Sequence, residues 1–521
     1  MKLTNLTTLK LFFLININIL MKKLDLFHFT IVQHYINDKT TYLNLMSVNH
    51  KFGKINEYLN QFNSYPPFND QKLFAQKKHS NYINDHLFIY NPHRISLTEN
   101  YITSEFIPNI PIDYYYLRNL VEFEKLNIQN LALNIIITNN ITTLYTNCFL
   151  NYINLESIII PSTISNIPKR TFGRCISLSS ILIPNSISYI DNGAFYDCIS
   201  LTDIQLQSHI SYLGKSVFYH CSKLKQINIP SLISDLNQNT FNNCISLEEI
   251  IIPSNVTKIS DNCFENCTKL SKITLPPTLK YIGNNCFIGC KNLITITIPN
   301  SVTYLGKLSF YKCKKLTSID ISINLFQLDD KTFFKCKSLK EINIPNSITI
   351  IYDNVFENCT NLSKITLSQG LIYIGYYTFK NSSLNEIILP SSLKVINDWA
   401  FSNCTNLTSV VLPSEIRKIN KGLFENCSQL KSIIIPDSVL LLSKYCFRNC
   451  FQLENINLST NLITIDPMVF KKCVSLKFIH FPSSIRRVSQ RSFEECTNLK
   501  KIEIDDLNKI YFDEKWLLNY I

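Results

Sequence analysis

Apolar and polar positions follow one pattern along most of this 521-residue chain, and the pattern returns every 23 residues. The copy that opens at Phe172 reads Phe-x-x-Cys-x-x-Leu-x-x-Ile-x-Ile-Pro-x-x-Ile-x-x-Ile. A fixed period of this length is typical of proteins in which one structural unit stacks on the next. The same phenylalanine opens sixteen copies, at Phe149, Phe172, Phe195, Phe218, Phe241, Phe264, Phe287, Phe310, Phe333, Phe356, Phe379, Phe401, Phe424, Phe447, Phe470 and Phe493.

The Ile-x-Ile-Pro segment of each copy alternates with period two, which predicts a short β-strand that ends at the proline. One unit cannot bury its own apolar side chains, so neighbouring units must stack and share a core. Equivalent strands then pair in parallel at a spacing of about 4.8 Å, which gives a sheet about 75 Å long for sixteen turns. The pattern therefore predicts a β-rich solenoid.

The repeat unit, as it stands from Phe264 to Ile282, resembles the BspA-like leucine-rich repeats of bacterial surface antigens and protist proteins. The resemblance implies a leucine-rich-repeat solenoid with a curved parallel sheet and a right-handed coil. It also implies a role in adhesion or protein binding, and a place at the cell surface. The matching positions are core positions, so they do not identify a ligand.

Four segments are expected. Residues 1–20 are either a signal-like stretch or an extension, residues 21–125 form a small, mainly helical region, residues 126–510 form the solenoid, and residues 511–521 form a C-terminal tail. The apolar part of the first segment is too short and too interrupted by asparagine to span a membrane.

The N-terminal region allows two interpretations. Residues 24–36 and 43–52 have a helical pattern, and helices there would cover the open end of the solenoid core. The same helices also distantly resemble an F-box, which implies a substrate adaptor of a ubiquitin ligase as the alternative function.

One copy is shorter than the others. From Phe379 the next phenylalanine follows after 22 residues, and Ser382 stands where the repeat has cysteine. A one-residue change shifts every later side chain unless the chain absorbs it locally. We therefore expect a local bend or altered curvature near this turn.

The formal net charge of +12 raises the question of a polyanionic partner. Most lysines are scattered, so a nucleic-acid partner is not expected. One dense stretch is either a solvated face or an anion-binding patch, and it contains Lys312, Lys314, Lys315, Lys331, Lys335, Lys337 and Lys340.

Catalytic and metal-binding patterns are missing from the sequence. Fourteen of the eighteen cysteines share one repeat position, and none forms the Cys-x-x-Cys pair of a metal site. We expect free buried thiols, with disulfides between neighbouring turns as the alternative. No phosphate-binding loop and no Ser/His/Asp set stands out, so neither an enzyme nor a cofactor is expected. Unpaired thiols favour a reducing compartment, in contrast to the surface location that the resemblance implies.

Outward-facing strand positions are the candidates for binding. They are mostly polar, but Ile388, Val411 and Ile434 stand at the same offset in three successive copies, and Phe478 and His480 follow two copies later. Adjacent exposed apolar residues typically indicate an interaction surface. The sequence therefore predicts contact with a protein or a glycoprotein through these five residues.

Overall fold

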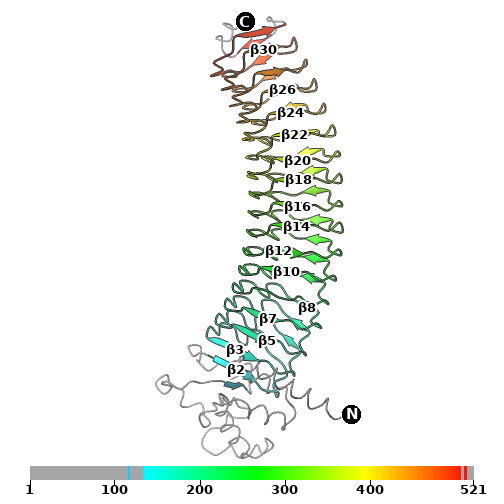
Figure 1. Cartoon of the computed structure of the whole chain (residues 1–521), viewed down its shortest axis with the longest axis vertical. Helices are drawn as coiled ribbons and strands as arrows, with labels where there is room; N and C mark the ends of the chain where they lie inside the picture. Colours follow the sequence, from blue (N-terminus) through cyan, green and yellow to red (C-terminus); the bar gives the residue numbers. More distant parts are fainter. Residues whose placement is uncertain (1–114, 118–132, 506–509, 513–521) are drawn as a thin grey trace, which may run out of the picture. The chain divides into compact units, whose positions relative to one another are not determined.

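A computed structural model describes residues 115–117, 133–505 and 510–512. The signal-like segment 1–20 and nearly all of the N-terminal region, including both interpretations of its helices, lie outside the described residues. Figure 1 shows the described turns stacked one upon the next in a single column.

Two strands form in each typical turn. The turn that opens at Phe172 has β5 (Ser180–Leu182) and then β6 (Tyr189–Ile190). We call the sets of equivalent strands the first and the second strand row. The first row comprises β1 (Tyr115–Leu117), β2 (Leu133–Ile137), β3 (Leu155–Ile159), β5, β7 (Asp203–Gln205), β10 (Glu249–Ile251), β12 (Lys272–Thr274), β14 (Thr295–Thr297), β16 (Ser318–Asp320), β18 (Glu341–Asn343), β20 (Lys364–Thr366), β22 (Glu386–Ile388), β24 (Ser409–Val411), β26 (Ser432–Ile434), β28 (Asn455–Asn457), β30 (Phe478–Phe481) and β32 (Lys501–Ile504). The second row comprises β4 (Asn166–Ile167), β6, β8 (Tyr212–Leu213), β9 (Asp235–Leu236), β11 (Lys258–Ile259), β13 (Tyr281–Ile282), β15 (Tyr304–Leu305), β17 (Gln327–Leu328), β19 (Ile350–Ile351), β21 (Tyr373–Ile374), β23 (Val395–Ile396), β25 (Lys418–Ile419), β27 (Leu441–Leu442), β29 (Thr464–Ile465), β31 (Arg487–Val488) and β33 (Tyr511–Phe512).

All strand pairs are parallel and join residues one turn apart. Glu249 of β10 pairs with Lys272 of β12, and Lys258 of β11 pairs with Tyr281 of β13. The predicted parallel-sheet solenoid is therefore confirmed, with about sixteen turns. The repeat pattern does not indicate the second row, because strands of two residues are too short to show an alternating pattern. This row continues to Tyr511 and Phe512, just past the expected end of the solenoid at residue 510.

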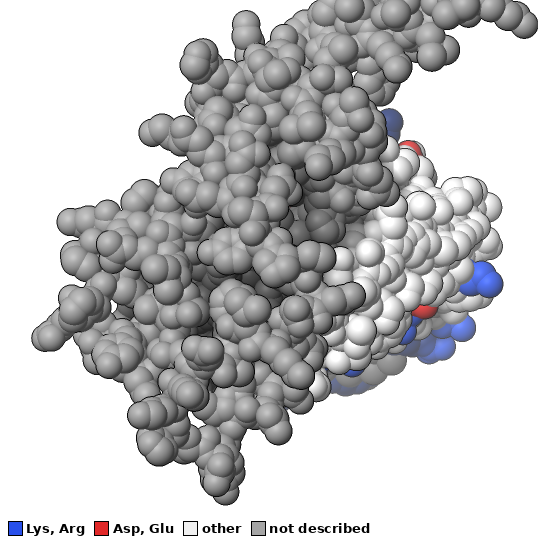
Figure 2. Space-filling model, turned by 90° about the horizontal axis from the view of Figure 1, so that it is seen from below, with Lys and Arg blue, Asp and Glu red and all other residues white. Residues whose placement is uncertain are grey.

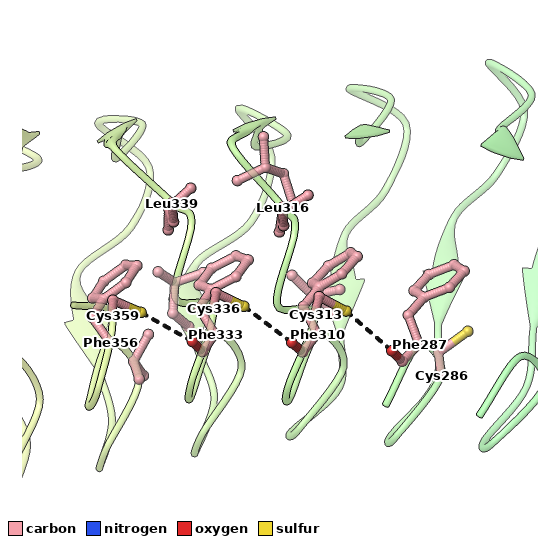
Figure 3. Packing of buried hydrophobic residues seen from close by; sticks show 14 of the residues in the cluster. Cys286, Phe287, Phe310, Cys313, Leu316, Phe333, Cys336, Leu339, Phe356 and Cys359 are labelled. Carbon is pink, nitrogen blue, oxygen red and sulfur yellow. Dashed lines mark hydrogen bonds between the residues drawn. The ribbon is translucent and has the colours of Figure 1, made fainter. Parts of the chain in front are cut away.

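Phenylalanine rings form the centre of the core. From Phe149 to Phe493 each ring stacks on the ring of the next turn, with centroid distances between 5.1 and 5.8 Å. Figure 3 shows four of these rings in line. Each of these phenylalanines is at most 2% exposed. Stacking between turns therefore contributes to the stability of the core.

The repeated cysteines line the same core. The thiol of Cys313 donates a hydrogen bond to the carbonyl oxygen of Phe287 in the preceding turn, at 3.2 Å. Cys336 and Cys359 donate equivalent bonds, each 3.1 Å long, to the preceding phenylalanine carbonyls (Figure 3). All eighteen cysteines are buried and free, as expected. The cysteine position thus supplies a small apolar side chain and also a donor for a buried carbonyl.

Left-handed backbone conformations flank the ring. The second residue before each ladder phenylalanine and the second residue after it both have a positive φ. Around Phe424 these residues are Gly422 (60°) and Asn426 (63°). Asparagine tolerates this conformation better than most residues. Its side chain also links turns, because the amide of Asn426 donates to Asn403 at 2.7 Å and that of Asn449 donates to Asn426 at 2.6 Å.

The short turn after Phe379 is absorbed locally. The rings of Phe379 and Phe401 still stack at 5.2 Å and 9°, and the Phe379 N–H donates to the Ala400 carbonyl at 2.8 Å. Ser382 occupies the cysteine position, where its hydroxyl lies 3.2 Å from the sulfur of Cys404. The missing residue falls in the loop between Ser382 and Leu384, so the ring ladder continues without interruption.

Replacing a ladder ring should destabilise the protein strongly. We expect Phe310→Ala to lower the free energy of unfolding by about 3–5 kcal/mol, because it leaves a cavity between two rings. The matched control is Phe326→Ala, since Phe326 is 67% exposed. Urea unfolding curves of both variants test this expectation, and an equal loss in the two variants would contradict the role of the ladder.

The thiols should resist labelling in the folded protein. Burial raises the pKa of Cys404 and that of Cys496 to about 12 each, so neither is a thiolate up to about pH 9. A disulfide reagent added to the native protein should label Cys496 first, because it is the most exposed of the eighteen. All eighteen should react in guanidinium. Fast native labelling of Cys313 or Cys336 would contradict the burial.

Candidate protein-binding surface

Three predicted site residues form one exposed apolar strip. Ile388, Val411 and Ile434 end the first-row strands β22, β24 and β26, and their exposures are 79%, 75% and 68%. Their inward neighbours Ile387 and Val410 are buried, because successive side chains of a strand point to opposite faces. We call Ile388, Val411 and Ile434 the apolar strip.

Strand pairing places the strip residues side by side. Ile388 pairs with Val411 in the parallel ladder of β22 and β24, and Ile434 pairs with Asn457 of β28. The Lys431 N–H donates to the Thr408 carbonyl at 3.3 Å and so links the turns that carry Ile434 and Val411. Thr366 and Asn457 stand at the equivalent positions on either side, so the strip has polar ends.

Phe478 and His480 form a separate pair on β30. Phe478 is 43% exposed, and His480 Nε2 lies 2.8 Å from Asp505 Oδ1. Strand β28, with Asn455 and Asn457 exposed, lies between them and the apolar strip. The five predicted residues therefore share one strand row but form two groups, and the imidazole of His480 is engaged by a carboxylate.

Other exposed apolar residues were not singled out from the sequence. Ile251 on β10 stands at the same offset as the apolar strip and is 72% exposed, but Asn228 and Thr274 flank it in the neighbouring turns. Ile323 and Phe326 are exposed outside the first row, in the segment between β16 and β17. The repeat offset of the apolar strip also indicates Ile251, whereas alternation along the first-row strands does not apply to Phe326, which lies outside them.

A shallow surface groove crosses four turns near the second strand row. Arg417 and Arg486 line its two ends, and Leu440 and Ile463 line the part between them. Its one carboxylate, Asp437, accepts the Thr460 backbone N–H at 2.9 Å, and this bond lowers the pKa of the carboxyl group. A general acid needs a raised pKa instead, so Asp437 is not suited to that role.

The described residues include neither a metal-ligand group nor a membrane-spanning helix. In the part of the chain that the structure describes, no three His, Cys, Asp or Glu side chains are grouped so that they could hold a metal ion. No helix among the described residues is long and apolar enough to cross a membrane. On the side of the turns visible in Figure 2, most atoms belong to uncharged residues, and Lys and Arg atoms project at the edge.

The fold and its exposed strand row define the class as a leucine-rich-repeat scaffold. The chain belongs to the BspA type leucine-rich repeat region family, whose model matches residues 122–248, 234–363, 326–453 and 441–516. The family assignment implied by the repeat unit is therefore confirmed. Proteins with this family and fold are typically non-enzymatic scaffolds.

One solved structure supports this fold, and a second is reported beside it. A leucine-rich repeat protein from Bacteroides ovatus has 27% sequence identity and a TM-score of 0.54, and the match covers 64% of this chain and 82% of that one. A leucine-rich cell surface protein from Faecalibacterium prausnitzii has 24% identity and a TM-score of 0.38, with 70% and 90% covered. No curated protein matches the chain.

Substitutions of two neighbouring residues on β22 should differ in their effect on stability, because one side chain is exposed and the other is buried. We expect Ile388→Asp to change the free energy of unfolding by no more than about 0.5 kcal/mol, because its side chain is in solvent. Its neighbour Ile387 is 4% exposed, and Ile387→Asp buries a charge and should unfold the surrounding turns. Thermal unfolding monitored by circular dichroism distinguishes them. A large destabilisation by Ile388→Asp would place the apolar strip in the core.

Proposed function

We propose that the protein is a non-enzymatic scaffold that binds another protein through the apolar strip, in an adhesion-type contact. The observation that carries the proposal is the exposure of three neighbouring branched apolar side chains on a face whose other turns are mostly polar. Burying such side chains against a partner is favourable because apolar surface leaves water. The rigid stack of turns holds the strip in place before binding, which lowers the entropic cost of association.

The strip is the centre of a larger contact. A stable protein interface buries roughly 800 Å² on each partner, which is more than three side chains supply. Polar residues at the preceding outward position, Ser409 and Ser432, and the acidic Glu386 border the strip and would form its rim. The partner that fits is a protein surface with an apolar centre and polar groups around it.

Two substitutions in the strip should abolish this contact. We expect the double variant Val411→Asp with Ile434→Asp to capture its partner at least about tenfold less than wild type, because a partner would have to desolvate two carboxylates. The matched control is Ile251→Asp, which adds a charge at the same offset in a turn outside the strip. Affinity capture with quantitative mass spectrometry measures the difference.

The Ile251→Asp control distinguishes loss of the proposed contact from a general effect of an added surface charge. A protein retained by wild type and by Ile251→Asp but lost by the double variant supports the proposal, provided that the circular dichroism spectra of all three agree. Equal recovery of every captured protein by wild type and by the double variant would refute it.

A further inference from the structure

A row of lysines lies on the loops that follow the ring-ladder phenylalanines of three consecutive turns. Lys291, Lys314 and Lys337 each stand four residues after the ring of their turn, at Phe287, Phe310 and Phe333. All three side chains are exposed. We call these three residues the lysine row.

Backbone hydrogen bonds hold the lysine row in register. The Lys315 N–H donates to the carbonyl of Lys291 at 3.2 Å, and the Ser338 N–H donates to the carbonyl of Lys314 at 3.2 Å. The three loops are therefore fixed one above the other. Their spacing follows the strand spacing of about 4.8 Å, so the row presents one ammonium group per turn over about 10 Å.

Further lysines surround the row. Lys315 and Lys340 are exposed, while Lys312 and Lys335 are half-buried. The ammonium groups of Lys312 and Lys335 lie over the rings of Tyr311 and Phe334, at 4.8 and 5.0 Å from the ring centroids. Among the described residues, none of the salt bridges of the structure involves any of these lysines.

The fold does not require lysine at the row positions. In several other turns a residue with a hydroxyl group occupies the equivalent position and bonds to the loop of the preceding turn. Thr268 Oγ1, for example, donates to the Ile245 carbonyl at 3.3 Å. Ser222 and Ser428 donate equivalent bonds at 3.2 and 3.3 Å. A lysine ammonium group is on a long side chain and projects into solvent instead, and three stacked like charges repel one another. The lysine row therefore lowers stability unless an anion neutralises it.

We propose that the lysine row binds a linear sulfated polysaccharide, at a site separate from the apolar strip. The ligand must carry anionic groups at intervals along its length to match one ammonium group per turn. The rings of Tyr311 and Phe334 stack on each other at 5.1 Å and 9°, and lysines cover them, so they do not offer free faces to the bases of a single-stranded nucleic acid. The Lys315 and Ser338 N–H groups are used between turns and are not open to an extended acidic peptide.

Heparin binding by the full chain tests the proposal. The test variant carries Lys291→Thr, Lys314→Thr and Lys337→Thr, because threonine occurs naturally at this position at Thr268 and Thr360. The matched control carries Lys225→Thr, Lys431→Thr and Lys500→Thr. These three exposed lysines stand seven residues after their phenylalanines, where Thr202, Thr317 and Thr408 occur naturally. Both variants lose the same net charge.

We expect wild type and control to bind immobilised heparin with similar affinity, and the test variant to bind at least about tenfold more weakly. Binding should weaken as salt rises, because exposed charges are screened. The Val411→Asp, Ile434→Asp variant should still bind heparin, which separates this site from the proposed protein contact. An equal loss in test and control variants, or no binding by wild type at low salt, would overturn the proposal. Tighter binding of single-stranded DNA at the same lysines would overturn the assignment to a polysaccharide.

Discussion

Stacking between neighbouring turns is the interaction on which the rest of the structure depends. Each phenylalanine ring inside the ladder stacks on the rings before and after it, and each repeated thiol donates to the phenylalanine carbonyl of the preceding turn. A single turn would leave its ring exposed and this carbonyl without its thiol donor. The apolar surface is therefore buried, and the phenylalanine carbonyls accept their thiol hydrogen bonds, only in the stack, as in other one-dimensional repeat proteins.

This constraint leaves the outer surface free to vary. Ring, thiol and strand interior are used in every regular turn, whereas the outward strand positions and the loops after the ring differ from turn to turn. The apolar strip uses outward positions of the first strand row, and the lysine row uses loops in an earlier set of turns. The two features share no residue, so one can be changed without altering the other or the core.

The sequence predicted the architecture well because the repeat positions are core positions. The recurring phenylalanine, cysteine and Ile-x-Ile-Pro segment specify the turn, the buried thiols and the first strand row. The second strand row was missed because two residues such as Tyr189 and Ile190 cannot show an alternation. The bend or altered curvature expected at the short turn stays a prediction, because the stacking of Phe379 on Phe401 shows only that the ring ladder continues there.

The candidate site was predictable only in part. Alternation along a strand correctly placed Ile388, Val411 and Ile434 on the outside, because each strand has one buried face. It could not show that His480 lies against Asp505, since that contact joins residues of different turns whose side-chain directions the pattern leaves open. The lysines were visible in the sequence as a dense stretch, but their register became clear only from the hydrogen bonds between loops.

The claim that turns are equivalent units stacked in register is tested most directly by excising one of them. Deleting residues 264–286 removes one whole repeat and joins Cys263 to Phe287, which recreates the natural Cys263–Phe264 junction. Hydrogen exchange of the deletion protein should show the remaining turns protected as in wild type. Deleting residues 264–275 removes about half a turn and should abolish protection on both sides of the junction. Loss of protection throughout the whole-turn deletion would contradict the account.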